Sequence, residues 1–154
     1  MYSNETVVEI IQYIDQNITK KISIEELANR FHFNKDYIMR LFKKEIHMTI
    51  TNYINKKRIY LSLNSLQNTE NSILKIALEN GFLSQEYYSE TFSKILKVSP
   101  ATYRKYTRRI SNITDYEYDT IIEKMNDLQY EMKYVEHYKT HTFQEKKKRL
   151  SLFG

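Results

Sequence analysis

Cysteine is absent from this chain of 154 residues, and the chain has only two glycines and one proline. Without cysteine it can form no disulfide, no thiolate metal site and no cysteine nucleophile. So few glycines and prolines cannot supply the turns of a β fold, and we expect an all-α protein. No apolar run approaches membrane-spanning length, and the N-terminus lacks the basic segment of a signal peptide. These absences predict a cytoplasmic protein with no membrane partner.

Hydrophobic residues make up 41% of the chain, enough to form a core. The formal net charge is +5, and it is unevenly distributed. Residues 1–109 hold 17 Lys and Arg against 11 Asp and Glu, a net charge of +6, whereas residues 110–154 carry −1. The positive part of the chain therefore favours a polyanionic partner.

Residues 22–44 read as two short helices separated by a tight turn. Ser23 and Glu26 form a capping box, so a helix should begin at Ile24. Asn34 can cap a second helix from Lys35 to about residue 45. The second helix has one apolar face and a mostly basic opposite face, which suits a DNA major groove. An ordinary helical hairpin with a solvated outer face is the alternative.

The same pattern returns in residues 73–95. Ala77 corresponds to Ala28 and Phe82 to Phe33, with one extra residue at the turn before Ser84, which corresponds to Asn34. Gly81 lies where a left-handed residue would end the first helix of the pair. Two copies of one helical pair within about seventy residues make a coincidence much less plausible.

Two further helices are predicted around these pairs. An N-terminal helix capped by Ser3 or Asn4 carries an apolar stripe of Val7, Ile10, Ile11, Ile14 and Ile18. Thr49 caps a long helix from Ile50 to about Gln67. Its expected apolar face consists of Ile50, Tyr53, Ile54, Leu61 and Leu66.

Residues 7–109 resemble the DNA-binding domain of the AraC/XylS family of bacterial transcription regulators. The matching runs are residues 23–28, 37–44, 53–55 with 58–59, 76–77, 81–82, 87–89 and 98–104. The resemblance implies seven helices in which two helix-turn-helix units are joined by a long central helix. It also implies double-stranded DNA as partner, a nucleoid-associated location, activation of transcription, and RNA polymerase as a further partner. Two recognition helices held by such a linker can enter successive major grooves about 34 Å apart.

The chain departs from the family pattern at three positions. A glycine commonly follows each recognition helix, but His47 and Lys97 occupy those places. A non-glycine residue there costs about 1 kcal/mol if the backbone is left-handed. Glu90 lies where the family frequently has arginine, which predicts weaker sequence recognition by the second unit.

Arg40 is the strongest candidate for base recognition, because a guanidinium can bind guanine O6 and N7 together. A phosphate contact is its alternative role. The complete set of candidate base-reading residues is Lys35, Asp36, Met39, Arg40, Gln85, Glu86, Ser89 and Glu90. Candidate phosphate contacts are Lys43, Lys44, Lys56, Lys57, Arg104 and Lys105. We expect no catalytic residue, no cofactor and no metal site; His137 and His141 lack an evident third ligand.

The remaining residues, 110–154, form a linker at 111–114 and a charged amphipathic helical tail. Tyr118, Ile121, Met125, Leu128, Met132 and Val135 recur with heptad spacing. This seam predicts a helix packed back on the domain, a homodimer through residues 115–138, or a docking segment for an effector domain. Packing is the interpretation that we favour, because three heptads containing Tyr and Met specify a partner poorly.

The predicted function is therefore a sequence-specific DNA-binding regulator. A protein-interaction adaptor that kept the fold and lost DNA recognition is the alternative, motivated by Glu86, Glu90 and the tail. The sequence contains no glycine-rich phosphate loop and no nucleophile paired with histidine, which argues against an enzyme.

Overall fold

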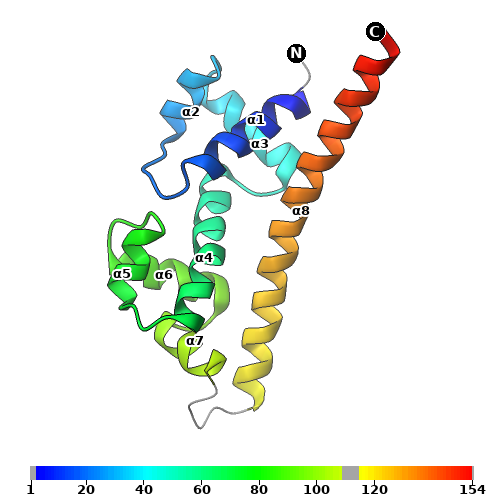
Figure 1. The fold of residues 1–154 in the computed structure, drawn as a ribbon. Coiled ribbons are helices and arrows are strands. Elements are labelled where there is room, and N and C mark those ends of the chain that lie inside the picture. Colours follow the sequence, from blue (N-terminus) through cyan, green and yellow to red (C-terminus); the bar gives the residue numbers. More distant parts are fainter. Residues whose placement is uncertain (1–2, 109–114, 154) are drawn as a thin grey trace. The chain divides into compact units, whose positions relative to one another are not determined.

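The computed structural model describes residues 3–108 and 115–153, and within them every regular element is a helix. The eight helices are α1 (Ser3–Gln16), α2 (Ile24–Arg30), α3 (Lys35–Ile46), α4 (Ile50–Asn68), α5 (Ile73–Glu79), α6 (Gln85–Leu96), α7 (Pro100–Thr107) and α8 (Asp115–Phe153) (Figure 1). The all-α prediction is confirmed. None of these helices is long and apolar enough to cross a membrane. The predicted linker at 111–114 lies outside the described residues.

The chain forms two compact units, each with its own core. The first unit contains residues 1–54 and 132–154. Its centre is the predicted N-terminal apolar stripe together with the inner face of α3. The whole stripe is buried as predicted, although α1 ends at Gln16 and Ile18 lies just beyond it. Phe42 of α3 lies 5.9 Å from the ring of Tyr53, and the Tyr53 hydroxyl donates to Asp15 Oδ1 at 2.6 Å. Burial and the Asp15 carboxylate both raise the pKa of Tyr53.

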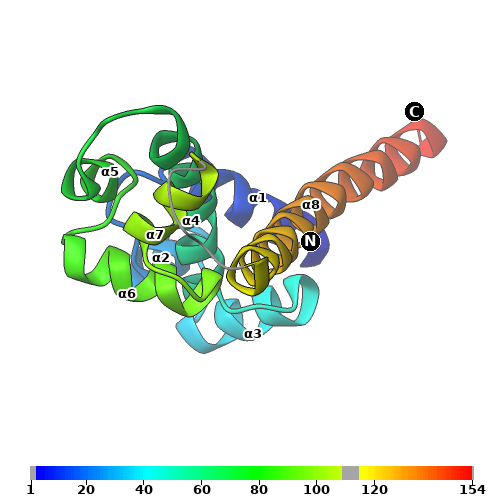
Figure 2. The same cartoon turned by 90° about the horizontal axis from the view of Figure 1, so that it is seen from below.

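The second unit contains residues 55–131 and is built around a series of aromatic contacts. Phe82 lies 5.1 Å from Tyr88, Tyr88 lies 5.7 Å from Phe92, and Phe92 lies 5.6 Å from Tyr103, all measured between ring centroids. The Tyr88 hydroxyl donates to Ser62 Oγ at 2.8 Å, and that hydroxyl donates to the Ile59 carbonyl at 2.7 Å. This buried relay joins α6 to α4. Figures 1 and 2 show α5 and α6 side by side in this unit.

The predicted apolar face of α4 is partly wrong, because Leu61 is 42% exposed. The buried residues of the first turn of α4 are Ile50, Tyr53 and Ile54, whereas further along they are Ile59, Ser62, Leu63 and Leu66. At about 100° per residue these two sets lie on different faces of the helix. The sequence predicted one continuous apolar stripe along α4. That prediction wrongly placed Leu61 on the buried face.

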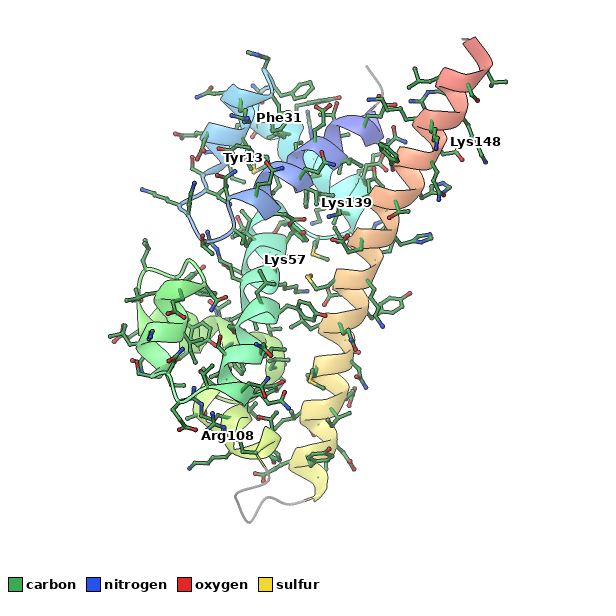
Figure 3. The ribbon with its side chains drawn as sticks, viewed as in Figure 1. Tyr13, Phe31, Lys57, Arg108, Lys139 and Lys148 are labelled. Atoms are coloured by element: carbon green, nitrogen blue, oxygen red, sulfur yellow. The ribbon has the colours of Figure 1, made fainter. Side chains whose placement is uncertain are left out.

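Two arginines, one in α7 and one that caps its C-terminus, close the C-terminal end of α4, whose last turn has no basic residue of its own. Arg104 donates to the carbonyls of Leu66 and Asn71 at 3.1 and 2.6 Å. Arg108, labelled in Figure 3, donates to the carbonyls of Leu66 and Gln67 at 3.3 Å and pairs with Glu70 at 2.6 Å. The contacts with Leu66 and Gln67 satisfy carbonyl groups that a helix end leaves without intrahelical partners.

The tail helix α8 packs against the rest of its own chain, the interpretation that we favoured from the sequence. Of the seam residues, Ile121, Leu128, Met132 and Val135 are buried, whereas Tyr118 is 47% exposed. In the first unit Tyr134 donates to the Glu45 carbonyl at 3.0 Å, and Lys139 pairs with Asp15 at 3.0 Å (Figure 3). In the second unit the Glu131 carboxylate accepts from Lys56 at 2.6 Å.

Candidate DNA interface

Helix α3 is the predicted recognition helix of the first unit, and its ends are defined as the sequence predicted. The Asn34 side chain accepts from the Asp36 amide at 2.8 Å and caps the N-terminus. The helix ends at His47, which has a left-handed backbone with φ of 65° and donates its amide to the Lys43 carbonyl. Its buried side chains are Ile38, Leu41, Phe42 and Ile46.

Arg40 lies at the centre of the exposed face of α3, because its position on the helix is opposite these buried residues. Asp36 and Lys44 lie one turn before and after it, and both are exposed. Met39 is 37% exposed, and Lys35 pairs with Glu25 at 3.6 Å. The four candidate base-reading residues of α3 therefore all lie on the solvent side of the helix.

Helix α6 repeats α3 at a spacing of 50 residues, with the same length of 12 residues. The Ser84 hydroxyl accepts from the Tyr87 amide at 3.1 Å, and the helix ends at Lys97 with φ of 63°. In this register Glu90 occupies the position of Arg40. The formal charge of the helix changes accordingly, from +2 for α3 to −1 for α6.

The remaining candidates on α6 are also largely accessible. Gln85, Glu86 and Glu90 are exposed and Ser89 is half-buried. Each occupies the position of one of the four candidates on α3, at the same spacing of 50 residues. The two faces are therefore matched in geometry and differ in chemistry.

The turns before the two recognition helices are also equivalent. His32 and Gly81 have positive φ values of 58° and 89°, which confirms the left-handed turn expected at Gly81. The Phe33 amide donates to the Ala28 carbonyl at 2.9 Å, and the Phe82 amide donates to the Ala77 carbonyl at 3.0 Å. The two helical pairs therefore share the backbone conformation of the turn as well as a similar sequence.

The candidate phosphate contacts divide into two groups. Lys43, Lys44 and Lys105 are exposed, and Lys57, labelled in Figure 3, is half-buried. Lys56 instead pairs with Glu131, and Arg104 donates to the carbonyls of Leu66 in α4 and of Asn71 beyond it. No local pattern in the sequence indicated these two partnerships, because Glu131 and Asn71 are distant in the chain from the residues that they bind.

Two tyrosines on the recognition helices were absent from the set of candidates. Tyr37 and Tyr87 are 40% and 46% exposed and lie at equivalent positions in the repeat. Their rings lie 5.1 Å from Phe33 and 5.8 Å from Phe82, and the Tyr87 hydroxyl accepts from Asn55 Nδ2 at 3.0 Å. The repeat itself could have identified them, because both helices carry tyrosine at the third residue.

Within the described residues no group of three or more His, Cys, Asp or Glu side chains could hold a metal ion. His137 and His141 stack on each other with ring centroids 6.2 Å apart.

Comparison with known proteins agrees with this geometry. A helix-turn-helix domain model matches residues 27–106. The regulatory protein SoxS of Escherichia coli is 30% identical over 104 residues, covering 68% of this chain and 97% of SoxS. The uncharacterized HTH-type transcriptional regulator YbfP of Bacillus subtilis is 31% identical over 118 residues, covering 77% of this chain, which spans only 40% of YbfP.

Among solved structures, the C-terminal domain of AraT, a response regulator from Geobacillus stearothermophilus, aligns with a TM-score of 0.64 and 31% identity. The alignment covers 72% of this chain and 92% of that domain. Together with the two exposed recognition helices, these likenesses identify a regulator of transcription that binds double-stranded DNA, and not an enzyme. The chain belongs to the AraC/XylS family of transcription regulators.

Proposed function

We propose that the protein is a sequence-specific transcription activator in which α3 and α6 enter adjacent major grooves and α3 supplies most of the base recognition. The observation that carries this proposal is the contrast at the centre of the two matched faces. Arg40 can bind guanine O6 and N7 with two parallel hydrogen bonds. Glu90, in the same position on α6, can accept from cytosine N4 but is repelled by phosphates.

The surroundings of Arg40 support a base contact. Lys43 and Lys44 are exposed in the last turn of the same helix, where they can hold the DNA backbone while Arg40 reaches the base edges. Met39 can contact a thymine methyl group, and Lys35 and Asp36 lie in the first turn. On α6 the corresponding residues are Gln85, Glu86 and Ser89, which can exchange hydrogen bonds with bases without adding positive charge.

Selection of bound sequences from a random DNA pool, followed by footprinting, would supply the site for the decisive test. Arg40→Ala should then cost about 1–3 kcal/mol on the selected site and far less on random duplex DNA. Lys44→Ala is the matched control on the same helix face. As a phosphate contact it should weaken both duplexes alike and lower the salt dependence by about one unit.

Base substitutions provide a second test of the same proposal. Changes in the half-site under α3 should cost more binding than changes one helical turn away. Equal penalties in both halves would show that the acidic helix recognises bases as strongly as the basic one. A uniform loss for Arg40→Ala across all sequences would make Arg40 a phosphate contact.

We place the DNA-binding domain in residues 1–109, with residues 110–154 as an accessory tail. Burial of Leu128, Met132 and Val135 within a single chain favours this role over a homodimer through residues 115–138. Sedimentation of the full chain and of a chain cut after Arg109, both at micromolar concentration, tests it. A clean dimer of the full chain that the truncation abolishes would overturn the assignment.

Activation through contact with RNA polymerase, which family membership suggests, is tested by transcription in vitro from a promoter that carries the selected site. Transcription should increase on addition of the protein. A decrease would make the protein a repressor.

A further inference from the structure

The tail helix forms two adjoining cavities with α4 and α7 inside the second unit. One has a volume of about 380 Å³ and its lining includes Tyr60, Asn64, Tyr103, Met125 and Gln129. The other has a volume of about 240 Å³, and its lining includes Tyr106, Tyr118 and Ile121. The two cavities share three lining residues, namely Gln67, Tyr103 and Met125.

The lining has an unusual composition for this chain. Charged residues make up 28% of the sequence, yet among the described residues no Asp, Glu, Lys or Arg lines either cavity. Four different tyrosines, a thioether and the side-chain amides of Asn64, Gln67 and Gln129 surround the space instead. Such a surface offers aromatic and sulfur contacts with a few hydrogen-bonding groups, whereas burying an ion there would be costly.

The hydroxyl of Tyr103 gives the site a specific polar feature. Tyr103 is only 2% exposed, and burial raises the pKa of its hydroxyl. The acceptor for this hydroxyl is Met125 Sδ at 3.3 Å. A thioether sulfur is a weak acceptor. The buried hydroxyl of Tyr103, a residue that lines both cavities, would therefore form a stronger hydrogen bond with a carbonyl or similar acceptor. By contrast, the neighbouring Tyr106 hydroxyl donates to a carboxylate oxygen of Glu117.

We propose that these cavities form a binding site for a small neutral aromatic ligand that carries a carbonyl or other uncharged acceptor. The rings of the ligand would lie among the tyrosines, and its acceptor would take the Tyr103 hydroxyl in place of Met125 Sδ. The site lies in the second unit and includes none of the residues proposed to contact DNA. Because both α7 and α8 line it, occupancy stabilises the packing of the tail on the domain.

A pair of fluorescent probes tests the site in the full chain. The first is 6-propionyl-2-(dimethylamino)naphthalene, a neutral naphthalene that carries a ketone, and the second is 2-(dimethylamino)naphthalene, which has the same ring and amine without the ketone. We expect saturable binding of both probes, measured by fluorescence anisotropy, and a blue-shifted emission of the ketone probe. Tyr103→Phe should weaken the ketone probe roughly threefold to tenfold and leave the other unchanged. If the ketone probe binds the unaltered protein and Tyr103→Phe equally tightly, the role of the Tyr103 hydroxyl is refuted.

Two neighbouring tryptophan substitutions on α8 locate the binding. Gln129 is exposed and lines the larger cavity, so Gln129→Trp should obstruct it and weaken both probes at least tenfold. Tyr130 is 74% exposed and lines neither cavity, so Tyr130→Trp is the matched control and should bind normally. Because both positions are exposed, both variants should fold, which circular dichroism checks. Equal binding by the two variants, or probe binding that does not saturate, would overturn the proposal.

Discussion

Replacing Glu90 with arginine should increase the affinity of the protein for DNA of any sequence. The equivalence of α3 and α6 makes the magnitude calculable. Glu90 occupies the position of Arg40, and the substitution changes the formal charge of α6 from −1 to +1. On random DNA, where no guanine need lie at this position, the new guanidinium can neutralise one phosphate instead of binding a base. This steepens the dependence of log K on log salt by at most about 0.9, which is at most roughly an eightfold gain at 0.1 M relative to 1 M salt. Removal of a carboxylate near the phosphates adds to this gain.

Fluorescence anisotropy with a labelled random-sequence duplex, titrated at several KCl concentrations, measures both the affinity and the slope. Glu90→Gln should give a smaller increase, because it removes the repulsion without adding a contact. Glu123→Arg is the charge control. Glu123 is exposed on α8, and its substitution changes the net charge by the same +2 outside the recognition helices. We expect its slope to stay close to that of the unaltered protein.

Equal effects of Glu90→Arg and Glu123→Arg would refute the argument, since they would show that net charge and not position determines the binding. A further outcome distinguishes the role of Glu90 on the selected site. If Glu90 accepts a hydrogen bond from cytosine, Glu90→Gln should weaken that site while strengthening random DNA.

Three other predictions follow from the core and the turns. Lys97→Gly should stabilise the fold by about 1 kcal/mol, or about 2–4 °C in melting temperature, because Lys97 is exposed and has positive φ. Ser62→Ala should cost about 1–3 kcal/mol in urea unfolding by leaving the buried Tyr88 hydroxyl without its acceptor, whereas Tyr88→Phe should cost about 1 kcal/mol, since Ser62 still donates to Ile59. Burial raises the pKa of Tyr88 to about 12, above its ordinary 10.0. The stability that the protonated Tyr88 hydroxyl contributes is therefore complete below pH 10 and is lost between pH 10 and 12. Absorbance at 295 nm follows the ionisation of tyrosine, and circular dichroism follows unfolding over the same range.

The sequence predicted those features that depend on neighbours in the chain. Caps at Asn34 and Ser84, the left-handed Gly81 and the inner face of α3 all follow from side chains within one or two turns of helix. Contacts between distant segments could not be predicted in this way. The sequence predicted Lys56 and Arg104 as phosphate contacts. In the fold Lys56 pairs with Glu131, and Arg104 donates to a carbonyl of the last turn of α4.

The error at Leu61 has a related cause. Periodicity assumes that one face of a helix is buried along its whole length. Helix α4 begins in the first unit and continues in the second, and each unit buries a different face of it. Averaged over its whole length, α4 therefore has no single apolar face, although residues of both of its parts are buried. A long helix with mixed periodicity is better divided before its faces are assigned.

Comparing the two copies of the internal repeat distinguishes positions where the backbone determines the residue from positions where it does not. Phe33 and Phe82 occupy equivalent places, their amides bond equivalent carbonyls, and both recognition helices run for 12 residues to a left-handed residue. Identity at such positions is explained by the backbone alone. Arg40 and Glu90 occupy one further equivalent position, exposed in both copies, where opposite charges are accommodated by the same backbone. Because folding makes no demand on that side chain, its chemistry is set by what lies outside the protein, which is why we assign the two helices unequal roles on DNA.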